Sequence, residues 1–460
     1  MARMLFGTDG IRGVAGDPPL DHTTVYAVGV ALGRHLAKTQ QDPWVVIGQD
    51  TRESSCWISD SITAGLQSAG VTVRSAGVIT TPGVAYLARQ SYDAGIVISA
   101  SHNPWTDNGI KVFGHDGYKL SDETEEQIET VIFDLLHGRV AGFDANNIPP
   151  QKEIRAVAGT DPELLQQYVR WLAKQIEGTR LSHLNVLVDC ANGASTPVAH
   201  EVFRACGLKA SFLHDQPTGR NINAHCGALH PDVVAIEIKK QPGKYDMGIT
   251  FDGDADRALF SDKYGNVVNG DAVLLMSARD MKPRGKLKAD TVVATTMSNM
   301  GLEIALRNAG IKMLRAPVGD KYVLEEMHKT GATLGGEQSG HIIYRDGDST
   351  TGDGILTALR VIEAMTHAGK PLHELVGDLK VFPQNIKNVR VKEKKPLDTF
   401  PDVVAAMKQG ESELEGNGRI VVRYSGTEAL ARVMVEAESE EKMKRITESV
   451  AGAIQKAIGV

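Results

Sequence analysis

Ser101 lies on a short segment of small and turn-forming residues between two β-like runs. The apolar run Ile96–Ile98 breaks into Ser-Ala-Ser-His-Asn-Pro, and a second β-like run follows at 110–113, with Lys111 inside it. This pattern predicts a buried strand that delivers a loop, with room for a ligand beside the small residues. A serine hydroxyl on such a loop is a candidate nucleophile, provided that other groups activate it.

Three aspartates alternate with small residues directly after another apolar run. The segment Thr-Phe-Asp-Gly-Asp-Ala-Asp-Arg contains Asp252, Asp254 and Asp256. Its small spacers allow the three carboxylates to converge on one hard cation, and Mg2+ suits such a site when a phosphate oxygen completes it. A Ca2+ loop of the EF-hand type would need a downstream glutamate that is missing. Three packed carboxylates without a cation would repel one another, so the pattern favours a metal site over an acidic turn.

Three further segments carry polar groups suited to sugars and phosphates. Gly-Gly-Glu-Gln-Ser-Gly-His places Glu337 and Ser339 where they could bind neighbouring sugar hydroxyls, and its His341 titrates near neutral pH. Arg-Tyr-Ser-Gly-Thr-Glu at 423–428 offers guanidinium, hydroxyl and backbone N–H donors, which fit a phosphate. Arg12 stands among three glycines, where the backbone can approach a ligand closely. Each segment alone is also typical of a solvated surface turn.

Repeated α/β units are predicted to position these loops. The same order of elements recurs at residues 44–73, 184–208 and 291–311: a strand, a polar loop, a helix, a glycine and a second strand. This order implies parallel βαβ units. Beyond residue 371, alternating strands and two helices predict a small α+β domain. We therefore expect three similar α/β domains with mixed, mostly parallel sheets and a C-terminal α+β domain around a central cleft. The expected domain bounds are 1–150, 151–255, 256–371 and 372–460.

Composition excludes several classes of partner. The 460 residues carry a net charge of −7, so no global basic field would hold nucleic acid or an anionic membrane. No stretch approaches the ~20 apolar residues of a membrane span, and the amino terminus lacks a signal-peptide pattern. The four cysteines form no Cys-x-x-Cys pair, which indicates reduced thiols in a cytoplasmic protein.

Taken together and in order, four of these segments resemble the α-D-phosphohexomutase superfamily. They are Ser-Ala-Ser-His-Asn-Pro, Asp-Gly-Asp-Ala-Asp-Arg, Gly-Glu-Gln-Ser-Gly-His and Arg-Tyr-Ser-Gly-Thr-Glu, and the similarity covers essentially the whole chain. Two further segments resemble the bacterial members that act on glucosamine phosphate. They are Phe-Gly-Thr-Asp-Gly-Ile-Arg-Gly near the start and Thr-Gly-Asp-Gly-Ile-Leu further on. The resemblance implies transfer of a phosphoryl group between O6 and O1 of that sugar. A phosphoserine and a glucosamine 1,6-bisphosphate intermediate would carry the transfer.

The resemblance also implies a role for each residue that matches a family motif. One Mg2+ would be bound by a phosphoserine oxygen at Ser101 together with Asp252, Asp254 and Asp256. Arg12, Lys111 and Arg257 would surround the phosphoserine, with Lys111 and His341 as candidates for general acid–base work. The implied contacts to the phosphorylated hexosamine are Glu337, Ser339, Arg423, Ser425, Gly426, Thr427 and Lys321. A homodimer is implied by the resemblance alone.

The phosphate motif departs from the family pattern at Tyr424, where the family commonly has Lys or Ala, and at Ala429, where it has Pro. Ala429 removes a rigid turn constraint, so this loop is expected to be looser without losing its donors. Because water must be kept from a phosphoserine, we also expect the C-terminal domain to close over the cleft from a link near Pro371.

Three alternatives stay open on the sequence. The first is a mutase for glucose or mannose phosphates, because Glu337 and Ser339 would read hydroxyls that these sugars share. The second is a phosphatase that works through a phosphoserine intermediate. The third is a non-catalytic phosphosugar-binding protein, for which an intact Ser101 and three aspartates would be unnecessary.

Overall fold

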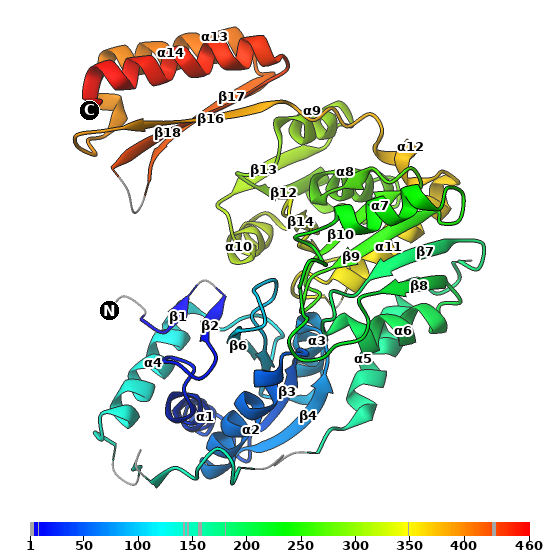
Figure 1. The fold of residues 1–460 in the computed structure, drawn as a ribbon, viewed down its shortest axis with the longest axis vertical. Coiled ribbons are helices and arrows are strands. Elements are labelled where there is room, and N and C mark those ends of the chain that lie inside the picture. Colours follow the sequence, from blue (N-terminus) through cyan, green and yellow to red (C-terminus); the bar gives the residue numbers. More distant parts are fainter. Residues whose placement is uncertain are drawn as a thin grey trace. The chain divides into compact units, whose positions relative to one another are not determined.

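Four β-sheets follow one another along the chain, each with helices packed against it (Figure 1). The computed structural model describes residues 4–7, 9–140, 143–144, 147–154, 159–179, 181–347, 349–425 and 429–460. Within these ranges no helix is long and apolar enough to cross a membrane. The four cysteines are free thiols, as the sequence indicated.

The first sheet has six strands in the order β1-β2-β6-β5-β3-β4. Strand β3 pairs in parallel with β4 and β5, whereas β6, β2 and β1 continue the sheet in antiparallel fashion. The strands are β1 (Phe6–Gly7), β2 (Gly10–Val14), β3 (Trp44–Gln49), β4 (Thr72–Val78), β5 (Ala94–Ile98) and β6 (Asp107–Gly114). The helices are α1 (His22–Leu36), α2 (Glu53–Ser68), α3 (Thr81–Ser91) and α4 (Asp122–Leu136).

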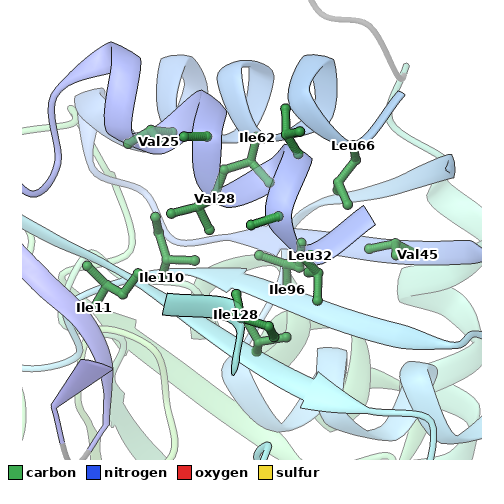
Figure 2. Close-up of a cluster of buried hydrophobic side chains, with 14 of the residues drawn as sticks. Ile11, Val25, Val28, Leu32, Val45, Ile62, Leu66, Ile96, Ile110 and Ile128 are labelled. Atoms are coloured by element: carbon green, nitrogen blue, oxygen red, sulfur yellow. The ribbon is translucent and has the colours of Figure 1, made fainter. Parts of the chain in front are cut away.

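The core of this first layer forms where α1 and α2 pack against the sheet (Figure 2). Val28 and Leu32 of α1 and Ile62 of α2 meet the sheet residues Ile96 and Ile110, all of them buried. Helix α1 begins at an Asp21 cap, whose side chain accepts a hydrogen bond from the Thr24 backbone N–H at 3.1 Å. Its residues from Ala27 to Gly33 are all buried, because α2, α4 and the sheet enclose the helix on more than one face. The layer thus fixes β5, the strand that leads to Ser101.

The second and third sheets repeat this plan. Their strand orders are β11-β10-β9-β7-β8 and β13-β12-β14-β15. The second sheet contains β7 (Asn185–Asp189), β8 (Lys209–Leu213), β9 (Met247–Phe251), β10 (Ala258–Asp262) and β11 (Val267–Val268), with α5 (Pro162–Lys174), α6 (Ser195–Ala205) and α7 (Asp232–Lys240). The third contains β12 (Thr291–Thr295), β13 (Lys312–Ala316), β14 (Leu334–Gly336) and β15 (Ile342–Tyr344), with α8 (Gly270–Met281), α9 (Met300–Asn308), α10 (Asp320–Thr330), α11 (Gly354–Ala368) and α12 (Leu372–Val376).

The fourth sheet is antiparallel and has the order β16-β18-β17. Its buried face packs against two helices, and this cluster includes Val433 and Ile454. The strands are β16 (Gln384–Arg390), β17 (Gly418–Tyr424) and β18 (Leu430–Ala437), and the helices are α13 (Pro401–Leu414) and α14 (Glu440–Ile458).

The chain divides into two compact units. Residues 1–296 and 314–376 form the first, and residues 297–313 and 377–460 form the second. The expected fold class is confirmed. The first three sheets are mixed, and the fourth sheet forms an α+β fold with its two helices. In the first two sheets parallel pairing reaches one edge, in β5-β3-β4 and β9-β7-β8, and antiparallel strands form the other side. In the third sheet β12 and β14 are parallel, and β15 forms an edge as an antiparallel strand. The glycines predicted to end three helices, Gly70, Gly207 and Gly310, all adopt positive φ.

Candidate active site

Ser101 follows strand β5 on a tight loop and is almost fully buried, with 1% of its surface exposed. Its φ of 53° lies in the left-handed region, which a non-glycine residue adopts only when its surroundings enforce it. The Ser101 hydroxyl donates a hydrogen bond to Asp252 Oδ2 at 2.6 Å, although 151 residues separate the two in sequence. The predicted nucleophile and the predicted metal loop are therefore in direct contact.

A buried ion pair beneath the loop holds this conformation. Arg52 and Asp50 form a bridge of 2.9 Å with neither side chain exposed. The Arg52 guanidinium also donates to the backbone oxygens of Ser101 and Asn103, at 3.1 and 2.7 Å. Asp50 accepts from the Ser99 hydroxyl, which in turn accepts from the Ser101 N–H. Because the donors fan out in a fixed fork, Arg52 fixes the loop in a way that a point charge cannot.

The three aspartates follow β9 and point into one buried site. Their nearest carboxylate oxygens lie within 4.8 Å of one another. Asp254 Oδ1 and Asp256 Oδ1 are buried without a hydrogen-bond partner among the described residues. Unpaired buried oxygens are costly, and converging oxygen ligands are what a hard divalent cation requires. The donor set therefore fits a metal ion.

The charge state of the aspartates reflects their crowding. Burial, together with the neighbouring Asp256 and Asp254, raises the pKa of Asp252 well above its usual value. Burial also acts to raise the pKa of Asp256, but Lys111 and His341 outweigh it and lower that pKa. A divalent cation would favour the ionised form of all three carboxylates.

Lys111 lies beneath the same loops and is 1% exposed. Its ammonium contacts Asp254 Oδ2 at 2.9 Å and Asp9 Oδ2 at 3.0 Å. Burial alone would lower the pKa of Lys111, but Asp254 and Asp9 outweigh it and raise that pKa. Lys111 is consequently a fixed positive charge at neutral pH.

Arg12 and Arg257 flank the Ser101 loop. Arg12 donates to the backbone oxygen of Ala100 at 3.2 Å and forms an ion pair with Asp9. The Arg257 backbone N–H donates to Asp252 Oδ1 at 3.2 Å, and its side chain lies 3.7 Å from Asp256 Oδ1. Both arginines line a cleft, so their guanidinium groups are placed to meet an anionic ligand.

The predicted sugar-binding segment begins where β14 ends. The Ser339 hydroxyl donates to Glu337 Oε2 at 3.2 Å, and Glu337 Oε1 accepts from the Gly319 N–H at 3.0 Å. His341 is 3% exposed; its Nε2 accepts from the Gly352 N–H at 3.1 Å, and its Nδ1 lies 3.6 Å from Asp256 Oδ2. The Gly352 contact places the proton of a neutral imidazole on Nδ1.

These groups share one cleft of about 420 Å³. It lies within the first unit, and Lys321 lines it while forming an ion pair with Asp122. The sequence-predicted residues that line it are Arg12, Arg257, Lys321, Glu337, His341 and Asp256. Ser101 and Lys111 lie buried beneath these walls.

The predicted phosphate segment belongs to the second unit. Arg423 is exposed at the end of β17, whereas Ser425 is buried. The Ser425 backbone oxygen accepts from the Lys394 ammonium at 2.7 Å. Gly426 and Thr427 lie outside the described residues.

Several site residues were missed by reasoning from sequence. Residue types and spacing predict no role for Arg52, Asp50, Lys119, Asp9 or Asp320. Lys119 donates to both Asp9 and Asp320, at 2.5 and 2.7 Å, and so joins two walls of the cleft. The Asp50-Thr51-Arg52 segment follows a strand as the aspartate loop does, and that parallel was an available signal.

Comparison with known proteins agrees with this architecture along the whole chain. The chain matches the Phosphoglucomutase/phosphomannomutase family in its alpha/beta/alpha domains I, II and III and its C-terminal domain. The matched residues are 3–137, 166–265, 269–382 and 386–453, respectively.

Curated relatives are similar over their full length. A phosphoglucosamine mutase of Koribacter versatilis is 61% identical over 100% of this chain and 98% of the relative. One from Solibacter usitatus is 51% identical over 100% of both. A crystal structure of a phosphoglucomutase/phosphomannomutase family protein from Burkholderia thailandensis aligns with a TM-score of 0.77, 24% identity and 99% coverage of both chains, which shows the shared fold. The chain belongs to the α-D-phosphohexomutase superfamily, in the family of the phosphoglucosamine mutases.

Proposed function

We propose that the protein interconverts glucosamine 6-phosphate and glucosamine 1-phosphate, with Ser101 as the phosphate carrier and Mg2+ at the three aspartates. The observation that carries the proposal is the contact between Ser101 Oγ and Asp252 Oδ2, beside two carboxylate oxygens that accept no hydrogen bond within the described part of the chain. A phosphate on Ser101 would add oxygen ligands at this point, next to aspartate oxygens that are able to bind a cation. The names of the curated relatives support the choice of sugar.

In the first half-reaction the bond between phosphorus and Ser101 Oγ breaks, and a bond forms from phosphorus to the free sugar hydroxyl. The resulting 1,6-bisphosphate turns over in the cleft, and the second half-reaction returns its other phosphoryl group to Ser101. Bound Mg2+ would supply positive charge next to the transferring group. Lys111, Arg12 and Arg257 add charge that is already in place before transfer begins.

Lys111 and His341 take different roles in proton transfer because their surroundings differ. Lys111 is the candidate acid: Asp254 and Asp9 keep it protonated, so it would give up its proton only to a strongly basic group such as the leaving Ser101 oxygen. His341 is the candidate to accept the proton of the sugar hydroxyl, once the Gly352 N–H releases Nε2. Such assistance is typically worth about 10²–10⁴ in rate.

Substrate contacts and assembly complete the proposal. Glu337 and Ser339 would hold sugar hydroxyls, and Lys321 would contact the ligand from the same wall. Arg423, Ser425, Gly426 and Thr427 would hold the phosphate that does not react. A cytoplasmic location, a homodimer and closure by the C-terminal domain belong to the same proposal.

Mass spectrometry combined with turnover tests the proposal. Protein treated with glucosamine 1,6-bisphosphate should gain about 80 Da on Ser101. Glucosamine 6-phosphate should then be converted to glucosamine 1-phosphate when Mg2+ is present, and the adduct should be back on Ser101 after each complete turnover. Ser101→Ala should abolish both, whereas Ser68→Ala on the exposed face of α2 should change neither.

The same assay separates the alternatives. Faster turnover of glucose or mannose 6-phosphate than of glucosamine 6-phosphate would replace the proposed substrate. Release of inorganic phosphate without isomerised sugar would indicate a phosphatase. Absence of turnover from fully phosphorylated protein would overturn the mutase assignment.

A further inference from the structure

One wall of the cleft carries a carboxylate that neither the metal site nor a phosphate requires. Asp320 is the first residue of α10, and its side chain remains 21% exposed where it lines the cleft. The arginines and lysine that share this cleft suit a phosphorylated ligand. A carboxylate facing the same space repels that ligand's phosphates. Its presence calls for a compensating positive group.

The protein supplies only part of that compensation. Lys119 donates to Asp320 Oδ2 at 2.7 Å and also to Asp9, which Lys111 and Arg12 contact as well. Among the described residues, no hydrogen bond reaches the second oxygen, Oδ1. Burial acts to raise the pKa of Asp320, but Lys119 and His341 outweigh it and lower that pKa. Asp320 therefore presents an ionised carboxylate with one oxygen available.

The position of Asp320 is tied to the sugar-binding segment. Glu337 Oε1 accepts the backbone N–H of Gly319, the residue directly before Asp320. Asp320 Oδ2 also lies 3.8 Å from His341 Nε2, on the other side of the same segment. A sugar whose hydroxyls are held by Glu337 and Ser339 would thus present its neighbouring ring substituent to Asp320.

We propose that Asp320 selects the amino sugar by accepting a hydrogen bond from the ammonium at C2 through Oδ1. This inference rests on the proposed function, because it assumes a glucosamine phosphate in the cleft. A hydroxyl at C2 gives a weaker bond, because it brings no positive charge to the carboxylate. Asp320 is accordingly a specificity-determining residue, while the phosphoryl transfer itself depends on the Ser101 side of the cleft.

The ratio of two specificity constants tests the proposal. The kcat/KM for glucosamine 6-phosphate and for glucose 6-phosphate are measured in parallel for the wild type and for Asp320→Asn. The variant should lower the glucosamine-to-glucose ratio by roughly 10- to 100-fold, which is the range for one hydrogen bond to a charged group. Asp320→Glu, which restores the charge on a longer side chain, should recover part of the ratio.

Controls distinguish selectivity from general damage. Glu325→Gln removes a carboxylate from the exposed part of the same helix and should leave the ratio unchanged. An equal loss for both sugars in Asp320→Asn, or an unchanged ratio, would overturn the role of Asp320. A wild type that does not turn over glucosamine 6-phosphate would instead overturn the proposed function, so the two failures are distinguishable.

Discussion

The chemistry of the site depends on side chains whose charges are fixed by burial. Arg52 and Asp50 form a fully buried pair, and Lys111 lies between Asp9 and Asp254. Removing one partner of such a pair leaves an unpaired charge, which typically costs about 3–5 kcal/mol. The residues around Ser101 are therefore expected to act through geometry as well as through charge.

Replacing Arg52 by Lys should separate these two effects. Lysine keeps the charge opposite Asp50 but cannot reproduce the donors to the Ser101 and Asn103 backbone oxygens. We expect kcat to fall roughly 10- to 100-fold through misplacement of Ser101, with little change in KM. Steady-state kinetics measure the effect, and Arg34→Lys on α1 is the control. A proportionate rise in KM with unchanged kcat would contradict this role.

Asp252→Asn should alter the response to metal removal. Without a cation, the neutral amide relieves repulsion from Asp254 and Asp256, so the variant should melt at a higher temperature than the wild type in EDTA. Addition of MgCl2 should stabilise the wild type, by about 2.7 kcal/mol at 100 times Kd, and the variant much less. Calorimetry measures both shifts. Equal stabilisation of the two proteins by MgCl2 would place the cation elsewhere.

At the scale of elements, close packing and helix ends position the catalytic loops. Helices α1 and α2 approach each other at Gly29 and Gly65, where an added Cβ would lie 2.3 Å from a backbone oxygen of the other helix. Further along the chain, Asp353 caps α11 by accepting from the Leu356 N–H at 2.9 Å. It directly follows Gly352, the donor to His341.

Gly65→Ala tests the helix crossing. Alanine should add up to about 1 kcal/mol of helix propensity, but the clash with the Tyr26 backbone oxygen outweighs it. We expect a net loss of about 1–3 kcal/mol in the free energy of unfolding. Gly452→Ala in α14 is the matched control, since its Cβ would meet nothing within 4 Å and should stabilise slightly. Denaturant unfolding compares them, and a stable Gly65→Ala protein would refute the packing argument.

Asp353 should make stability depend on pH in an unusual direction. Burial raises its pKa to about 6, and Tyr168 donates to its carboxylate at 2.6 Å. Because the folded state binds this proton more tightly than the unfolded state, the contribution is fully present below about pH 4 and is lost as pH rises through 6. The full contribution of Asp353 to the free energy of unfolding is about 3 kcal/mol.

Asp353→Asn keeps the helix cap but removes the titration. Urea unfolding between pH 4.5 and 7 should show the wild type gaining stability relative to this variant as pH falls. Asp122→Asn, at an exposed helix start, serves as the control. A difference that stays constant across this range would show that Asp353 does not titrate there.

The elements were more predictable than the contacts between them. The βαβ pattern, the glycine helix ends and the loops bearing Ser101 and Asp252 could be read from residue types and spacing. The burial of Arg52 could not, because an arginine after a strand is usually solvated and only tertiary packing shows its partners. The position of Asp320 beside the sugar-binding segment could not be predicted either, because it depends on the hydrogen bond from the Gly319 N–H to Glu337.

At the scale of the whole molecule, the second unit combines two separate chain segments. Asn299 accepts from the Phe382 N–H at 2.8 Å and donates to the Phe382 oxygen at 3.0 Å. The Met300 N–H donates to Glu436, which also pairs with Arg419. These bonds join residues 297–313 to the fourth sheet and its strand β18 within one unit.

Asn299→Ala should therefore loosen the second unit alone. Loss of these buried hydrogen bonds is expected to cost about 1–3 kcal/mol. Hydrogen exchange should accelerate in β18, while β5 of the first unit keeps its protection. Asn388→Ala on an exposed face of β16 is the control. Faster exchange in both strands would show that the two units unfold together.

The split origin of the second unit has a consequence for synthesis. Residues 297–313 leave the ribosome well before β18, by roughly 6 to 25 s at typical elongation rates. During that interval the Met300 N–H, which donates to Glu436 of β18 in the finished protein, lacks this partner. This stretch therefore joins its own unit only when the chain is nearly complete, which makes it the point where a holding chaperone would act.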